Sequence, residues 1–329
     1  MNDIRVCELF AGIGGFRYGF EKASERFTTV FANELDKYAA SIYRCNWPDG
    51  SLREGDITQI RTCDVPDFDL LCGGFPCQSF SMAGKRQGLR DPRGQMFQEI
   101  LRFTKEKRPK MLLFENVPGL LSIDYGRVFE AMLRSLGEFG YVCEWQIFDS
   151  QFFGVPQQRR RVFIVGYSAE LGRGRGTVFP IGQSDCVGVE AYEKDRIVSS
   201  TLTVSYGVKQ NVGGNTFLIQ PRPTNKEADQ VRLYINKAPT LQARMGTGGG
   251  NVPYVLREGQ ALRRLSLVEC ERLQGFPDNH TKYGFTVSGE SVEVSKTQRY
   301  KCLGNAVTTN VVRAIGGLIV DFLGREVVQ

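Results

Sequence analysis

Histidine is nearly absent from this chain, which has one, His280, among 329 residues. A single imidazole disfavours hydrolases built on Ser-His-Asp or Cys-His arrangements, because only one residue could act as the base. His280 follows a turn-like run at residues 277–279. It is therefore predicted to be an exposed loop residue.

Paired cysteines and long apolar runs are also missing. The nine cysteines are scattered, are odd in number and include no CxxC pair, so a zinc site is not expected. Together with the lack of a signal peptide, this pattern fits a reducing cytoplasm. No apolar stretch is judged long enough to span a bilayer, and residues 316–323 are predicted to form a buried C-terminal helix. The formal charge of +6 allows a polyanionic partner without requiring one.

Apolar strands alternate with amphipathic helices in the first half of the chain. We predict strands at residues 4–10, 28–32, 68–72, 110–114, 141–148 and 161–167. One helix is predicted to follow the glycine cluster and to end at residue 22. Three more helices are predicted to span residues 37–45, 96–105 and 126–139. This order predicts an α/β fold with a doubly wound, mostly parallel sheet. Ligands of such sheets lie at the carboxyl ends of the strands.

The pattern changes after residue 167. Residues 172–259 are rich in Gly, Thr, Asn and Val, with short strands predicted at 201–206, 216–220 and 232–236. Helical periodicity returns at 266–274 and 307–323. We expect a first domain at 1–171, a smaller β-rich domain at 172–262, and a third part, 263–329, whose last helix returns to the first domain.

Four predicted strands end in residues suited to chemistry. They bring the glycine cluster at 12–15, Glu34, Cys77 and Glu115 to one rim. Arg17 stands at the last glycine of GxGxxG, which weakens a nicotinamide-dinucleotide interpretation. The turn still allows close approach to a nucleoside, with Glu34 on ribose hydroxyls. A plain tight turn and an exposed carboxylate fit equally well.

Cys77 directly follows a strand and a proline, which places it at the rim. A nucleophilic thiolate needs an electropositive setting, and Arg159 and Arg161 are candidate sources. Most cysteines are merely small buried hydrophobic residues, and an isolated glutamate is usually only solvated. The pairing of Cys77 with Glu115, a possible proton donor to a ring nitrogen, is what favours a catalytic site.

In order along the chain, these motifs resemble those of the cytosine-5 DNA methyltransferases of bacterial and phage restriction-modification systems. The resemblance covers almost the whole sequence. The matching blocks are residues 10–16, 33–34, 55–57, 69–71, 74–78, 114–117, 157–161, 264–277 and 304–307.

The resemblance implies a sequence-specific DNA (cytosine-5)-methyltransferase with the class I methyltransferase fold, using S-adenosylmethionine. The target cytosine is expected to be flipped out of the duplex. Cys77 is expected to add to ring carbon 6, and Glu115 to hold and protonate ring nitrogen 3. Arg161 is expected to hold the cytosine carbonyl oxygen, and Arg159 to help position or activate the thiolate side.

The resemblance also assigns binding residues. Those for the cofactor are Phe10, Ile13, Gly14, Gly15, Glu34, Leu35, Asp56, Ile57, Pro76 and Asn305. Leu35 stands where several relatives carry an aromatic residue. Residues 79–94 are expected to form a mobile loop over the DNA, and residues 240–243 and 246–253 a glycine-rich recognition loop. The expected DNA contacts are Gln78, Ser81, Lys85, Arg93, Arg232, Gln242 and Arg244.

Three alternatives remain open: an RNA methyltransferase, a non-catalytic regulator with this fold, and an unrelated nucleotide-binding oxidoreductase. The long variable segment favours DNA, and the intact Cys77, Glu115, Arg159 and Arg161 favour catalysis. By resemblance, we expect a cytoplasmic monomer that acts on double-stranded DNA, needs no metal or membrane, and has a possible cognate restriction endonuclease.

Overall fold

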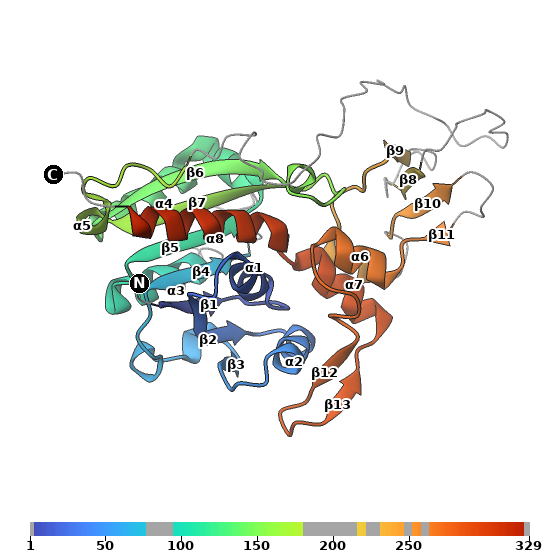
Figure 1. The fold of residues 1–329 in the computed structure, drawn as a ribbon, viewed down its shortest axis with the longest axis horizontal. Coiled ribbons are helices and arrows are strands. Elements are labelled where there is room, and N and C mark those ends of the chain that lie inside the picture. Colours follow the sequence, from blue (N-terminus) through green and yellow to red (C-terminus); the bar gives the residue numbers. More distant parts are fainter. Residues whose placement is uncertain are drawn as a thin grey trace.

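A seven-stranded sheet forms the centre of the molecule (Figure 1). The computed structural model describes residues 3–76, 95–179, 216–221, 231–246, 252–257 and 263–325. The sheet order is β3-β2-β1-β4-β5-β7-β6. Its strands are β1 (Ile4–Leu9), β2 (Phe27–Glu34), β3 (Leu52–Glu54), β4 (Leu70–Gly74), β5 (Met111–Asn116), β6 (Tyr141–Asp149) and β7 (Arg160–Ser168). β1 to β5 are parallel and β7 is antiparallel to both its neighbours, so the predicted mostly parallel sheet is confirmed.

Helices cover both faces of this sheet. The first are α1 (Gly15–Ala23), α2 (Lys37–Asn46), α3 (Gln95–Lys107), α4 (Arg127–Glu138) and the short α5 (Ala169–Gly172). The later ones are α6 (Leu267–Leu273), α7 (Lys296–Asn305) and α8 (Thr309–Gly324). One apolar cluster joins the sheet to α1 and α8, and another joins it to α3 and α4. The sheet is therefore buried on both faces, as expected for parallel strands joined by helices.

The C-terminal helix α8 packs against α1, near the start of the chain. α8 packs along α1 so closely that a Cβ on Gly19 would lie 2.6 Å from Cβ of Val312. The stretch Lys296–Gly324 does have the length and apolar composition of a membrane span, contrary to our expectation from sequence. It consists of α7 and α8, and more than half of its most apolar window is buried within the fold. Core packing therefore accounts for its composition.

A second, four-stranded antiparallel sheet has the order β11-β10-β8-β9. Its strands are β8 (Thr216–Pro221), β9 (Val231–Ile235), β10 (Tyr254–Arg257) and β11 (Arg263–Arg264). The strands predicted at 216–220 and 232–236 are confirmed, and the one at 201–206 lies outside the described residues. In Figure 1 this sheet lies beyond the carboxyl ends of the parallel strands. Its assignment to a separate domain at 172–262 stays a prediction.

A hairpin that the sequence analysis missed packs beside α2. It consists of β12 (Tyr283–Phe285) and β13 (Ser291–Glu293), which form a two-stranded sheet. Arg44 Nη1 on α2 donates to the carbonyl oxygen of Phe285 at 2.7 Å. β3 and α7 were also missed, because the first is only three residues long and the second has weak amphipathicity.

Candidate active site

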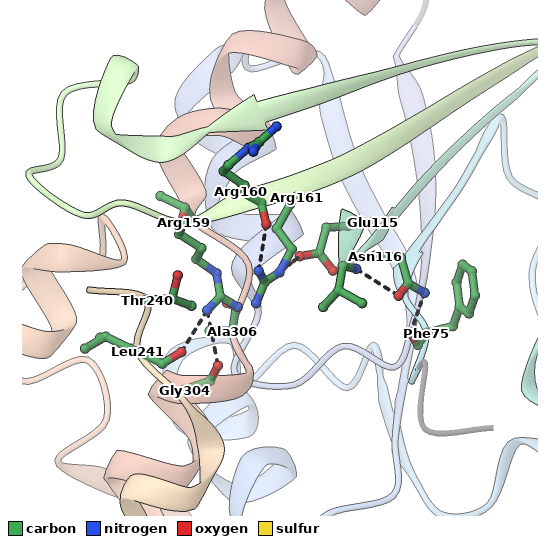
Figure 2. A network of polar contacts seen from close by, with 12 residues as sticks. Phe75, Glu115, Asn116, Arg159, Arg160, Arg161, Thr240, Leu241, Gly304 and Ala306 are labelled. Carbon is green, nitrogen blue, oxygen red and sulfur yellow. Dashed lines mark hydrogen bonds and ion pairs between the residues drawn. The ribbon is translucent and has the colours of Figure 1, made fainter. Parts of the chain in front are cut away.

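The ends of β4 and β5 are tied together at the rim of the sheet. Asn116 Nδ2, at the end of β5, donates to the carbonyl oxygen of Phe75 at 3.0 Å (Figure 2). Phe75 and the exposed Pro76 continue β4 directly toward Cys77, which lies outside the described residues. The buried Asn116 amide therefore fixes the direction in which the chain leaves β4 toward the predicted nucleophile.

Glu115 and Arg161 form an ion pair from neighbouring strands. Arg161 Nε lies 2.9 Å from Glu115 Oε1, and the two side chains are 16% and 12% exposed. The contact lacks hydrogen-bond geometry: Oε1 is buried and has no hydrogen-bond partner among the described residues. Gly74 makes room for the other oxygen, because a Cβ there would lie 3.2 Å from Oε2. A buried acceptor of this kind is suited to a bound polar ligand.

Arg159 is buried and binds the backbone of two distant segments. Its Nη1 donates to the carbonyl oxygens of Leu241 at 3.0 Å and Gly304 at 3.4 Å, and its Nη2 to that of Ala306 at 2.7 Å (Figure 2). Burial lowers the pKa of Arg159 to about 9, which leaves it charged at neutral pH. No sequence pattern predicted this anchoring, because its partners lie 82 to 147 residues away. A role for Arg159 at the thiolate stays a prediction.

A pair of buried glutamines extends the same network. Gln157 Nε2 donates to the carbonyl oxygen of Leu273 at 2.7 Å and contacts Gln274 Oε1 at 3.3 Å, while Gln157 Oε1 accepts from the Leu241 amide. Gln274 Nε2 in turn donates to the carbonyl oxygen of Leu303. The two side-chain amides thus satisfy backbone groups of three segments in the interior, at Leu241, Leu273 and Leu303.

Residues 240–246 pack against α7. Leu241 is fully buried, and a Cβ on Gly304 would lie 2.1 Å from the carbonyl carbon of Gln242. Gln242 is half-buried, and Arg244, in η8 (Ala243–Gly246), is exposed. Of Arg232 in β9 only the backbone is described, and Gln78, Ser81, Lys85 and Arg93 lie outside the described residues, as does the predicted loop 79–94.

The glycine turn and Glu34 meet at the end of β1. Phe10, Gly12 and Gly14 have φ of +55°, +57° and +81°. Glu34 Oε2 accepts from the Gly12 amide and Oε1 from the Asp36 amide, both at 2.7 Å. Burial raises the pKa of Glu34. Each carboxylate oxygen retains a second lone pair, which suits it to ribose hydroxyls.

The other predicted cofactor residues surround this turn less directly. Asp56 is exposed and accepts from the Thr58 amide at the start of a short helix, η1 (Ile57–Gln59), and Ile57 is buried. Leu35 is 68% exposed, and Asn305 is exposed at the end of α7. Among the described residues, no hydrogen bond joins Asp56 or Asn305 to the glycine turn.

His280 is not the exposed loop residue predicted from sequence. It is 5% exposed, and its Nε2 lies 2.9 Å from the carbonyl oxygen of Ile13. Its ring stacks on Phe276 with centroids 4.3 Å apart. The turn-like residues before it predicted the loop correctly, but the burial depends on contacts far away in the sequence.

A mostly parallel sheet with helices on both faces, a glycine turn bonded to Glu34 and the mostly buried Glu115–Arg161 pair define an α/β protein with a candidate site at the rim of its sheet. The model of the family "C-5 cytosine-specific DNA methylase" matches residues 4–321. The chain therefore belongs to the C-5 cytosine-specific DNA methyltransferases, and it is a DNA cytosine-5 methyltransferase of the type II restriction-modification kind.

Curated relatives cover nearly the whole chain. This chain is 37% identical to the type II methyltransferase M.BsuFI of Bacillus subtilis, and the match covers 97% of this chain and 73% of that one. It is 35% identical to M.NlaX of Neisseria lactamica, covering 94% of both chains. It is 32% identical to M.HhaI of Haemophilus parahaemolyticus, covering 96% of this chain and 94% of that one.

Solved structures agree on the fold. The Dnmt2 methyltransferase of S. pombe superimposes with a TM-score of 0.67 at 20% identity, covering 98% of this chain and all of that one. A putative DNA modification methyltransferase from an E. coli prophage gives a TM-score of 0.64 at 19% identity, with the same coverage.

Proposed function

We propose that this methyltransferase modifies carbon 5 of a cytosine flipped out of duplex DNA, through a covalent adduct with Cys77. The ion pair of Glu115 with Arg161, beside the β4 exit that leads to Cys77, is the observation that carries this proposal. The ion pair keeps a carboxyl group and a guanidinium group mostly shielded from solvent. Such groups are strongest as ligands where water is excluded.

The rim fits S-adenosylmethionine as the cofactor. Glu34 would present a half-buried carboxylate to the ribose, and a Cβ on Gly12 would meet nothing within 4 Å, so the turn is open. Phe10, Ile13, Gly14, Gly15, Leu35, Asp56, Ile57, Pro76 and Asn305 would complete the site. When bound, the cofactor supplies the methyl group in an electrophilic sulfonium form.

The residues of the chain account for the remaining chemistry. The Cys77 thiolate forms a bond to ring carbon 6 and pushes an electron pair into the ring. Glu115 gives a proton to ring nitrogen 3, so negative charge does not accumulate and carbon 5 becomes nucleophilic. Arg161 orients Glu115 and holds the cytosine carbonyl oxygen. After methylation nitrogen 3 returns its proton to Glu115, a base takes the proton from carbon 5, and Cys77 leaves with the electron pair of the C–S bond.

The proposed partners of the enzyme are double-stranded DNA and a cognate restriction endonuclease. The sheet β11-β10-β8-β9 would belong to a target-recognition domain, with Arg232, Gln242 and Arg244 at DNA, and Gln78, Ser81, Lys85 and Arg93 on a loop over the duplex. The enzyme would act as a cytoplasmic monomer alongside a cognate endonuclease. The net charge of +6 suits a polyanionic substrate.

Transfer of tritium from labelled S-adenosylmethionine to unmethylated duplex DNA tests this function, with Cys77→Ser run alongside. We expect label in DNA with the wild type and none with the variant, and bisulfite sequencing would then give the target site. Label in transfer RNA instead would move the assignment to an RNA enzyme. Label in neither would favour a non-catalytic regulator.

A further inference from the structure

His280 lies in the loop after α6 yet contacts the cofactor turn at the other end of the chain. Its Nε2 is 2.9 Å from the carbonyl oxygen of Ile13, and the residue is buried, with 5% of its surface exposed. The acceptor is a carbonyl, so Nε2 must carry the proton. The backbone of His280 is itself fixed, because Asn46 Nδ2 donates to its carbonyl oxygen at 3.1 Å.

Aromatic rings hold the imidazole in this orientation. The ring stacks on Phe276 at an interplanar angle of 17°, and the rings of Trp47 and Tyr18 lie 5.8 Å and 6.1 Å from it. Trp47 also covers the turn directly: a Cβ on Gly14 would lie 2.1 Å from its ring. The imidazole is therefore wedged between three rings and the turn, with little freedom to rotate.

The contact acts on a single peptide unit. The Ile13 carbonyl and the Gly14 amide share one plane. His280 binds the carbonyl, and the Gly14 amide donates to the carbonyl oxygen of Ala11 at 2.9 Å. With both ends of the plane bonded, the turn between Gly12 and Gly14 has one preferred shape. Core packing alone would not require this nitrogen, because a phenylalanine ring would fill the same space.

We propose that His280 is a positioning residue for the cofactor, which fixes the Ile13–Gly14 peptide through its Nε2–H and thereby presets the turn. The inference rests on the proposed use of S-adenosylmethionine at this turn. Burial lowers the pKa of His280, so the ring performs this role in its neutral form. Loss of the donor leaves the Ile13 carbonyl unsatisfied and the turn free to change shape before binding.

The test compares three variants of the full chain by calorimetric titration with S-adenosylmethionine and by steady-state kinetics. His280→Phe keeps the ring and removes the donor. We expect its Kd and KM for S-adenosylmethionine to rise about tenfold, with kcat and the KM for DNA within about twofold. His280→Gln restores a donor and should recover most of the affinity. Thr281→Val is the matched control, because it removes a buried hydroxyl from the same loop that bonds to Glu271 and Arg299.

Equal weakening by Thr281→Val would overturn the inference, as would an unchanged Kd in His280→Phe. A wild-type chain that binds no S-adenosylmethionine would instead overturn the cofactor assignment on which the inference rests.

An independent readout needs no variant. Because His280 is the single histidine, ¹⁵N-histidine labelling of the untagged chain reports on this ring alone. We expect the Nε2–H tautomer and a shift on addition of S-adenosylmethionine. The Nδ1–H tautomer at neutral pH would refute the proposed contact.

Discussion

Replacing Arg159 by alanine should cost a large part of the stability of this enzyme. The guanidinium makes two well-formed bonds to carbonyl oxygens, at 2.7 Å to Ala306 and 3.0 Å to Leu241, and one long bond of 3.4 Å to Gly304. A hydrogen bond to a charged group contributes about 1.5–3 kcal/mol. The two short bonds therefore predict a loss of about 3–6 kcal/mol, which is a substantial fraction of the roughly 5–15 kcal/mol typical of a folded domain.

Urea denaturation followed by tryptophan fluorescence measures this loss. Arg159→Lys should recover about half of it, because an ammonium keeps the charge but lacks the planar fork that reaches two carbonyls. Arg160→Ala is the matched control, since Arg160 is the next residue and is exposed (Figure 2). Its free energy of unfolding should stay within about 0.5 kcal/mol of the wild type.

Unfolding of Arg159→Ala at the same urea concentration as Arg160→Ala would show that the three carbonyl bonds of Arg159 do not stabilise the fold. A stable but inactive Arg159→Ala enzyme would point instead to direct action on the thiolate side.

Three further predictions test other parts of the structure. In Glu115→Gln the side chain keeps its shape but can neither protonate the base nor pair with Arg161, so kcat should fall at least about 100-fold in the tritium assay, and activity above a tenth of wild type would contradict the assignment. Gly304→Ala places a methyl group 2.1 Å from a backbone carbon and should cost about 1–3 kcal/mol, whereas Gly317→Ala, in open space on α8, should be neutral or stabilising by up to about 1 kcal/mol in thermal melts. Burial raises the pKa of Glu8 in the folded state to about 8, whereas in the unfolded chain it is about 4.3. The folded state therefore binds this proton more tightly. The resulting contribution to the free energy of unfolding is complete below about pH 4.3 and is lost as the pH rises to about 8. The Tm of Glu8→Gln minus that of the wild type should thus increase from pH 5 to pH 9, and parallel pH curves would show that Glu8 is ionised in the fold.

The sheet and its rim could be predicted because their signals are local. The runs that became β1, β4 and β5 are apolar, short and bounded by turn residues, which is typical of strands buried on both faces. Once parallel order was inferred, Glu34 and Glu115 had to share one edge. Ser266 and Glu269 likewise form the capping box of α6, a pattern that is readable from their spacing.

The buried polar network could not be predicted, because its partners are far apart in the chain. Gln157 and Gln274 have no local feature that distinguishes them from surface glutamines. In the fold, Gln157 bonds to the backbone of Leu273, next to Gln274, and Gln274 bonds to the backbone of Leu303. The burial of His280 could not be predicted for the same reason. Its stacking on Phe276 is local, but the Ile13 carbonyl that it binds lies 267 residues away.

The spacing of the QxRxR motif has a physical explanation in this structure. Residues two apart in an extended chain face the same side. Gln157 and Arg159 are buried and Arg161 is nearly so, whereas Arg160 between them is exposed. Along this one face Gln157 binds α6, Arg159 binds the segments at Leu241 and Ala306, and Arg161 binds Glu115. A shift of one residue would turn all three side chains to solvent. The extended segment from Gln157 to Arg161 therefore orients the Glu115 carboxylate and also holds the later segments of the chain against the rim, so that their docking and the geometry of the site depend on the same register.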